Sequence, residues 1–492
     1  MLLAGGITLP ISAAIALEPA HHDGATFVYM GEMWARGVLP YVQIFDNKPP
    51  GIFAVSALAA HTPSTIWAIA VIQFIFVMGC IYTVRSLLQI GGASPRAVLL
   101  GTLAMALMAN LQAYAPGNMA ESYMLWPMAA SMLFFFRALR SGNLRDVFLA
   151  GLLSGVACMF KPFGLSAMIA QMAFVLTSMG HLNADDPVFS HDNRMTWTMA
   201  NGFGAITAWI PAIAYFAVHH GLRQMFNASF FYNAHYGAAA KPLALVTLSM
   251  VATRLLPVAS TVVCLSLGWQ RDRSETWMLT QLWFGVGLGL VLMAGRGYGH
   301  YFMSLTPALA LAAGLFFWHV EESAPEMRRT IGALILAPIF LAYVPGFVDV
   351  RDVMRHRDTP VDETARELKL IAKPSDTLLV WGYEPWLFSS THLRSALRYP
   401  TTQYMYDSPY QYPRVGKEIL TGMQTSPPDW VVVAPGEYTP AWLTQPDRME
   451  SAFMSNLHAH YALAWQQDGF TIYKRTTLRG SLPELASRVA HH

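Results

Sequence analysis

The sequence predicts a polytopic α-helical membrane protein of about 11 transmembrane helices, followed by a C-terminal α/β domain. Two observations support this. Only 13% of the 492 residues are charged and 54% are hydrophobic, whereas a soluble domain usually carries about 25% charged residues. The 62 charges are also unevenly placed, with 31 in residues 1–348 and 31 in the much shorter segment 349–492. The chain therefore divides near Phe347 into an apolar part and a part that resembles a soluble domain.

Eleven segments are long and apolar enough to be membrane spans. A bilayer core needs roughly 20 apolar residues per helix, because hydrocarbon offers no partner to unpaired backbone groups. The first segment contains Pro10, but it lacks the basic start of a signal peptide, so we interpret it as a helix. The expected spans are residues 1–17, 64–84, 97–115, 122–139, 147–160, 163–180, 197–218, 246–268, 277–294, 301–319 and 330–348.

The basic residues of the loops predict the orientation, because cytoplasmic loops carry an excess of lysine and arginine. One set of loops holds Arg85, Arg96, Arg137, Arg140, Arg145, Arg194, Arg271, Arg273, Arg328 and Arg329. The other set holds Arg36, Lys48, Lys161, Arg223, Lys241 and Arg296. We therefore expect the first set and the N-terminus to be cytoplasmic. Residues after 348 are then extracytoplasmic, and a bacterial inner membrane is the expected location.

Residues 349–477 are expected to form the extracytoplasmic α/β domain, and residues 478–492 a loose tail. The periodicity predicts helices at 361–372 and 414–423 and strands at 377–381 and 430–433. Gly382 and Gly436 follow the two strands, but no phosphate-binding glycine pattern surrounds either. This favours a lid or scaffold over a second catalytic centre.

The first outside loop, residues 18–63, is the most informative segment of the chain. It is too long for a simple connection, and long loops are usually functional. Asp23 follows the first span closely, and an ionisable group at a membrane boundary is costly and therefore suspect. The alternative, equally supported by spacing alone, is that Asp23 caps a helix that begins near Ala25.

The motif in this loop resembles a known family. The arrangement is Asp23, Tyr29, Gly37, Pro40-Tyr41, Asp46 and Lys48-Pro49-Pro50, followed by an apolar span. It is similar to the first loop of the polyprenyl-phosphate-sugar-dependent membrane glycosyltransferases, which include protein O-mannosyltransferases and aminoarabinose transferases. Later matches are Glu121 at the outer start of the fourth span, Lys161-Pro162, and His300-Tyr301 before Pro307. One departure is Gly24, where many relatives carry a second acid.

This resemblance implies a GT-C fold and a glycosyltransferase that moves a hexosyl or pentosyl group from a polyprenyl-phosphate-linked donor. The acceptor, whether lipid, polysaccharide or protein, would lie outside the cytoplasm, and transfer would proceed with inversion. Fixed cations in a low-dielectric site stabilise a departing phosphate, and a carboxylate takes the proton of an acceptor hydroxyl. The expected roles are catalysis for Asp23 and Glu121, phosphate binding for Lys48, Lys161, Arg254 and Arg296, and substrate contact for Tyr41, Asp46, His300 and Tyr301.

Structural explanations compete with several of these roles. Lys48 and Arg254 can extend to the membrane surface as ordinary interfacial side chains. Glu121 can be a helix N-terminal charge that is favoured by the helix dipole. In isolation each explanation is common, and the family motif is what favours function for Lys48.

Other partners and cofactors find little support in the sequence. A formal net charge of +2, with no basic stripe, argues against nucleic acid. His21, His22, His235 and His300 share no ligand spacing, so no cofactor is expected, although the sequence leaves a divalent metal possible. Asp185, Asp186 and Asp192 are expected to be solvated acids of a cytoplasmic loop.

Two other function classes stay open at this stage. A transporter or flippase of an anionic sugar lipid would also need many spans with boundary cations. Transporters usually have internal repeats and broken helices at mid-membrane, whereas the polar residues here gather at the outer surface, so the enzyme is favoured. The third class is an inactive scaffold with an outside binding domain.

Overall fold

The computed structural model describes residues 1–17, 22–177, 191–238, 243–268, 274–353, 359–436, 443 and 447–476. Several residues and segments named above lie outside these ranges. They are His21, Asp185, Asp186, Lys241, Arg271, Arg273 and the expected tail at 478–492.

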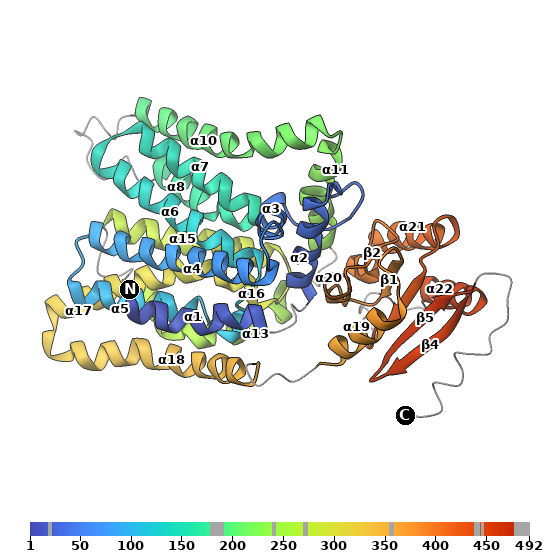
Figure 1. The fold of residues 1–492 in the computed structure, drawn as a ribbon. Coiled ribbons are helices and arrows are strands. Elements are labelled where there is room, and N and C mark those ends of the chain that lie inside the picture. Colours follow the sequence, from blue (N-terminus) through green and yellow to red (C-terminus); the bar gives the residue numbers. More distant parts are fainter. Residues whose placement is uncertain are drawn as a thin grey trace.

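The first part of the chain is a bundle of helices, and the second part is built on a β-sheet at one end of this bundle (Figure 1). The longer helices of the bundle are α1 Leu2–Leu17, α2 His22–Ala35, α3 Pro50–Ala59, α4 Thr65–Ile90, α5 Pro95–Met108, α6 Ala120–Ser141, α7 Leu144–Phe160, α8 Ser166–Thr177, α10 His191–Val218, α13 Leu243–Leu255, α14 Ala259–Gly268, α15 Glu275–Met293, α17 Thr306–Ser323 and α18 Arg328–Val353. The short helices are α11 Leu222–Phe226, α12 Asn233–Ala238 and α16 Gly299–Phe302.

Each of the eleven expected spans coincides with one of these helices or with consecutive helices. Among the described residues, six helical segments are long and apolar enough to cross a membrane. They are Thr65–Ile90, Arg194–Val218, Ser249–Gly268, Glu275–Met293, Gly299–Ser323 and Pro325–Val348. The helical membrane protein is therefore confirmed, whereas the count of eleven crossings stays a prediction.

The outer helices expose apolar side chains that suit a lipid environment. On α10 these include Met199, Phe203, Ile206 and Ile210, which recur at helical spacing along one face. By contrast, α17 is buried along most of its length and forms the centre of the bundle. Exposed apolar faces of this size are expected where lipid, and not water, surrounds the protein.

The second part of the chain contains a five-stranded sheet in the order β2-β1-β3-β5-β4. The strands are β1 Thr377–Trp381, β2 Arg394–Ser395, β3 Trp430–Val433, β4 Tyr461–Gln467 and β5 Phe470–Arg475, and the helices are α19 Pro360–Ile371, α20 Trp386–Thr391, α21 Gln411–Thr425 and α22 Arg448–His460. We call residues 359–476 the α/β unit. The two expected strands are observed as β1 and β3, which pair in parallel.

The close contact between α7 and α10 positions the end of α7, which leads into Lys161. Three glycines allow it, because a Cβ atom on Gly151 would lie 1.9 Å from the Asn201 carbonyl oxygen and one on Gly204 would lie 2.2 Å from the Phe148 carbonyl oxygen. Gly155 makes a similar approach to α10. Small residues at such spacing let helix backbones approach closely within membranes.

We predict that Gly204→Val destabilises the protein, because the added side chain forces α7 and α10 apart. Gly202→Val is the matched control, since a Cβ atom there meets only the end of Met172 at 3.8 Å. In detergent, the midpoint temperature of thermal unfolding should fall clearly for Gly204→Val and change little for Gly202→Val. Equal stability of the two variants would contradict the packing argument.

Candidate active site

A cavity of about 1050 Å³ lies between the helical bundle and the α/β unit. The bundle contributes Asp23, Asp46, Lys48, Lys161, His300 and Tyr301 to its walls, and the α/β unit contributes residues that follow β1 and β3. Six of the ten predicted site residues therefore line one space. The other four, Tyr41, Glu121, Arg254 and Arg296, stand behind the wall or away from it.

Lys48 is held by its own loop. The Asp46 carboxylate accepts a hydrogen bond from the Lys48 backbone N–H at 2.8 Å, and the Tyr41 hydroxyl donates to the Lys48 carbonyl at 2.9 Å. Pro49 and Pro50 then begin α3, where proline needs no N–H partner. Tyr41 is fully buried and is a support for Lys48, which differs from the substrate contact expected for it.

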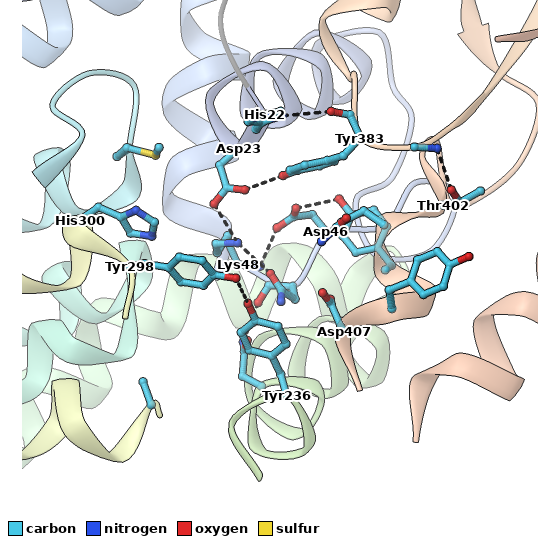
Figure 2. Close-up of a pocket in the computed structure, with 18 of the residues that line it drawn as sticks. His22, Asp23, Asp46, Lys48, Tyr236, Tyr298, His300, Tyr383, Thr402 and Asp407 are labelled. Carbon is cyan, nitrogen blue, oxygen red and sulfur yellow. Dashed lines mark hydrogen bonds and ion pairs between the residues drawn. The ribbon is translucent and has the colours of Figure 1, made fainter. Parts of the chain in front are cut away.

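Asp23 lies in the first turn of α2, and its carboxylate faces the cavity between Tyr383 and Lys48 (Figure 2). The Tyr383 hydroxyl donates to Oδ1 at 2.5 Å, and Lys48 Nζ lies 3.6 Å from Oδ2. Because α2 begins at His22, Asp23 lies inside the first turn and not before a helix that begins near Ala25, so the capping alternative does not describe its position. Asp23 instead joins the first loop to the α/β unit.

The charged groups in this cluster shift one another's pKa values. Burial disfavours the carboxylate form of Asp23, but the Lys48 ammonium group and the Tyr383 hydrogen bond outweigh it and hold the pKa of Asp23 well below its usual value. Burial likewise favours neutral Lys48, yet the Asp23 and Asp46 carboxylates raise the pKa of Lys48 above its usual value. Both groups are therefore ionised at neutral pH.

A second ion pair joins Lys161 to Glu121 inside the bundle. Lys161 is the residue after α7, in extended backbone before Pro162, and its Nζ also lies 3.8 Å from the centre of the Tyr301 ring. The His300 Nε2 lies 4.0 Å from the Glu121 carboxylate. Glu121 is only 1% exposed and does not line the cavity, but it contacts Lys161 and His300, which do.

Arg254 and Arg296 occupy different places from those expected of phosphate ligands. The Arg254 guanidinium group donates to the carbonyls of Gly297 and Ala113 and does not line the cavity. Arg296 lies 4.0 Å from the centre of the Tyr236 ring and donates to the Asp407 carbonyl at 3.0 Å. Arg254 therefore ties loops of the bundle together, and Arg296 ties the bundle to the α/β unit.

The α/β unit adds site residues that the sequence did not identify. The Tyr404 hydroxyl donates to Asp46 at 2.9 Å, and the Tyr232 hydroxyl of the bundle donates to Asp407 at 2.6 Å. Burial raises the pKa of the Asp407 carboxyl to about 7, against the effect of the Tyr232 hydrogen bond. The only sequence signal for this wall was the position of Gly382 and Gly436 directly after strands.

Metal binding finds no ready-made site in the described part of the chain. There, no group of three or more histidine, cysteine, aspartate or glutamate residues is arranged to hold an ion. The two lysines that line the cavity are instead each paired with a carboxylate, Lys48 with Asp23 and Lys161 with Glu121.

The comparisons with known proteins concern both sequence and fold. Residues 47–188 match the model of the dolichyl-phosphate-mannose-protein mannosyltransferase family, a segment that includes Lys48, Glu121 and Lys161. No curated protein matches the chain. Crystal structures of ArnT from Cupriavidus metallidurans, bound to undecaprenyl phosphate and in the apo state, align at 13% identity with TM-scores of 0.66 and 0.65. These alignments cover 97% and 96% of this chain and 98% and 97% of those chains.

A third crystal structure, the Archaeoglobus fulgidus oligosaccharyltransferase in complex with Zn and sulfate, aligns at 13% identity with a TM-score of 0.51. The alignment covers 96% of this chain and 72% of that one. The chain has the GT-C fold. This confirms the resemblance drawn from the first loop and Glu121, and the family match supports the predicted glycosyltransferase. Nothing in these comparisons supports the transporter alternative.

We predict that Glu121→Ala alone destabilises this GT-C protein, because it leaves Lys161 buried without its partner. Removal of one member of a buried pair typically costs about 3–5 kcal/mol. The double variant Glu121→Leu with Lys161→Met should recover much of this loss in thermal unfolding, because it replaces the pair with apolar side chains. A stable Glu121→Ala protein would show that the pair is not a structural element.

Proposed function

We propose that this protein transfers a sugar from a polyprenyl-phosphate-linked donor to an acceptor hydroxyl on the extracytoplasmic side of the membrane, with inversion. The observation that carries this proposal is the cavity beside the α/β unit, in which Lys48 and Lys161 lie on one wall. The family match over residues 47–188 contains both lysines. The similar fold of an ArnT bound to undecaprenyl phosphate supports a lipid phosphate as the donor's carrier.

Lys48 and Lys161 bind the phosphate of the donor. Their ammonium groups stabilise the negative charge that collects on the phosphate oxygen as the bond to the anomeric carbon breaks. Both lysines are mostly buried, with side-chain exposures of 18% and 8%, so water screens them little. Lipid phosphate leaves with the bonding electron pair while the acceptor oxygen bonds to the anomeric carbon from the opposite face.

Asp23 is the general base that takes the proton of the acceptor hydroxyl. In the free protein its basicity is suppressed by Lys48, at 3.6 Å, and by Tyr383. Donor phosphate on Lys48 neutralises the nearest cation and adds a negative charge, and both effects raise the proton affinity of a neighbouring carboxylate. The base therefore strengthens when the donor is in place.

Asp407 is a second candidate for the base, because its pKa of about 7 matches a proton acceptor at neutral pH better than a strongly acidic carboxyl does. The pH dependence of kcat/KM separates the two, since this ratio reports the free enzyme. With Asp23 as base, kcat/KM should stay constant as the pH is lowered and should fall only at pH values well below the usual pKa of an aspartate. With Asp407 as base, it should fall as the pH drops below about 7.

The cavity and α/β unit lie, in this proposal, on the extracytoplasmic side of a bacterial inner membrane. The basic set of loops then lies on the cytoplasmic side. Arg96 in this set begins α5 and pairs at 2.9 Å with Glu321 near the end of α17. Figure 1 shows the α5 and α17 labels at the end of the bundle away from the sheet, which supports this assignment. The α/β unit acts as a cover that keeps water from the reacting groups.

We predict that Lys48→Ala in the reconstituted protein weakens binding of polyprenyl phosphate and slows sugar transfer together. The physical reason is the loss of a buried cation next to the departing phosphate. Binding is measured by titration with polyprenyl phosphate, and transfer by the movement of label from donor to acceptor. Lys373→Ala, at an exposed lysine of the α/β unit, is the control. Unchanged kinetics in a folded Lys48→Ala protein would remove this residue from the site.

We predict that Asp23→Asn reduces turnover by about 100-fold to 10,000-fold, the usual loss for a general base, while polyprenyl phosphate still binds. Binding should be retained because asparagine no longer competes for the Lys48 charge. Single-turnover transfer at saturating donor measures the chemical step. If Asp23→Asn transfers sugar at a near-normal rate, the base is another group. The variants Asp407→Asn and Asp23→Asn with Glu121→Gln then show which of the two acids carries the role.

A further inference from the structure

The α/β unit presents a crevice to the cavity at the carboxyl ends of two parallel strands. In its sheet β1 lies between β2 and β3, and both neighbours are parallel to it. The chain passes from β1 to β2 on one side and then returns to β3 on the other side. Ligands in open α/β sheets bind at this kind of switch point, outside the carboxyl ends of the strands.

The residues that follow these two strands line the cavity. Trp381, Gly382, Tyr383 and Glu384 come from the end of β1, and Val433 to Gly436 come from the end of β3. Gly382 has a φ of +120° and Gly436 a φ of +101°, a region that favours glycine. A Cβ atom on Gly382 would lie 2.9 Å from the Ala434 Cβ atom, so the two loops approach closely at the crevice floor.

The crevice lacks the features that bind phosphate. Within the described residues, the α/β unit contributes no lysine or arginine to the cavity wall, but it contributes Glu384, Asp407 and Glu450. The N-terminus of α22, which follows β3, is capped by Asp447, whose carboxylate accepts from the N–H groups of Met449 and Glu450. Carboxylates in these places repel an anion that a helix N-terminus would otherwise attract.

The crevice instead carries aromatic rings, hydroxyl groups and an amide. Tyr383, Tyr404, Tyr406 and Trp381 line it together with Thr402 and Gln403. Figure 2 shows Thr402 beside the loop that contains Tyr383, where its hydroxyl accepts from the Gly382 N–H at 2.9 Å. Apolar rings that alternate with a few polar groups of fixed direction are suited to a neutral ligand with many hydroxyl groups.

An extended peptide is favoured less by this geometry. Peptides commonly bind to α/β and β proteins by adding a strand to an exposed sheet edge. The cavity meets the ends of β1 and β3, and neither is an edge strand, because β2 and β4 occupy the two edges. A ligand in the cavity therefore meets side chains and loop backbone, and it does not meet the unpaired N–H and C=O groups of an edge strand that an extended peptide would need.

We infer that the crevice at the carboxyl ends of β1 and β3 is the acceptor subsite and that the acceptor is an uncharged, hydroxyl-bearing carbohydrate. This rests on the proposed function, which it deepens by naming the class of acceptor. The same cavity holds the donor phosphate at Lys48 and Lys161, so the acceptor hydroxyl meets the anomeric carbon near Asp23. Asp23 bridges the two halves because it contacts Lys48 on one side and Tyr383 on the other.

The test compares three acceptor probes with full-length protein in nanodiscs and a labelled polyprenyl-phosphate sugar. The probes are a neutral hexose oligosaccharide, a phosphate-bearing glycolipid and a serine-containing peptide. We expect the neutral oligosaccharide to have the highest kcat/KM. A preference for the glycolipid or for the peptide would overturn the inference.

Gln403→Lys adds a cation to the crevice and tests where the acceptor binds. Gln403 is partly exposed on the cavity wall. We expect about a tenfold rise in KM for the oligosaccharide and a gain for the phosphate-bearing probe, because a neutral ligand that covers the new ammonium group removes water from it without offering an opposite charge. Gln424→Lys, on an exposed part of α21, is the matched control and should change neither value. No change in acceptor KM with Gln403→Lys would refute the subsite.

Binding of polyprenyl phosphate, measured in parallel, distinguishes failure of the acceptor inference from failure of the proposed function. If the protein binds polyprenyl phosphate and uses a charged or peptide acceptor, only the acceptor inference fails. If it neither binds polyprenyl phosphate nor consumes the labelled donor with any probe, the proposed function itself fails.

Discussion

The docking of the α/β unit on the first loop is the constraint on which the site depends. Hydrogen bonds from this unit end on loop residues that belong to the site or support it. Tyr383 donates to Asp23, Tyr404 donates to Asp46, and the Arg398 guanidinium group donates to the Tyr41 carbonyl at 2.8 Å. The position of the Asp23 carboxylate is thus set by a segment more than 300 residues away in the sequence, and the α/β unit forms part of the cavity wall.

Each of the two buried lysines is stabilised by a carboxylate next to it. An isolated ammonium group in a low-dielectric place is very costly, and each lysine reduces this cost with a carboxylate of its own. Lys48 has Asp23, and Lys161 has Glu121. In the proposed mechanism, a donor phosphate replaces one anionic partner of each lysine by another, so binding requires little new separation of charge. If Asp23 is the base, as proposed, the same exchange releases it from the cation that lowers its proton affinity.

The sequence predicted the parts of the structure that depend on local pattern. Apolar runs located the helices, and the motif around Asp23 and Lys48 located one wall of the cavity. The sequence could not predict contacts between residues that only the fold brings together. Arg254 stands in an apolar stretch, which suggested a phosphate ligand, yet the fold supplies backbone carbonyls of Ala113 and Gly297 as its partners. Asp407 and Tyr404 follow no motif, and only docking of the α/β unit brings them to the cavity.

The family likeness covers part of the helical wall of the cavity and none of its α/β wall. The matched segment, residues 47–188, includes both lysines proposed to bind phosphate. The crevice residues after β1 and β3 lie entirely outside it. In the proposed reaction the same sugar–phosphate bond always breaks beside the same cations, whereas acceptors can differ in charge and shape. In the proposed mechanism the α/β wall, which within the described residues contributes no lysine or arginine, differs with the acceptor, while Lys48 and Lys161 stay on the helical wall.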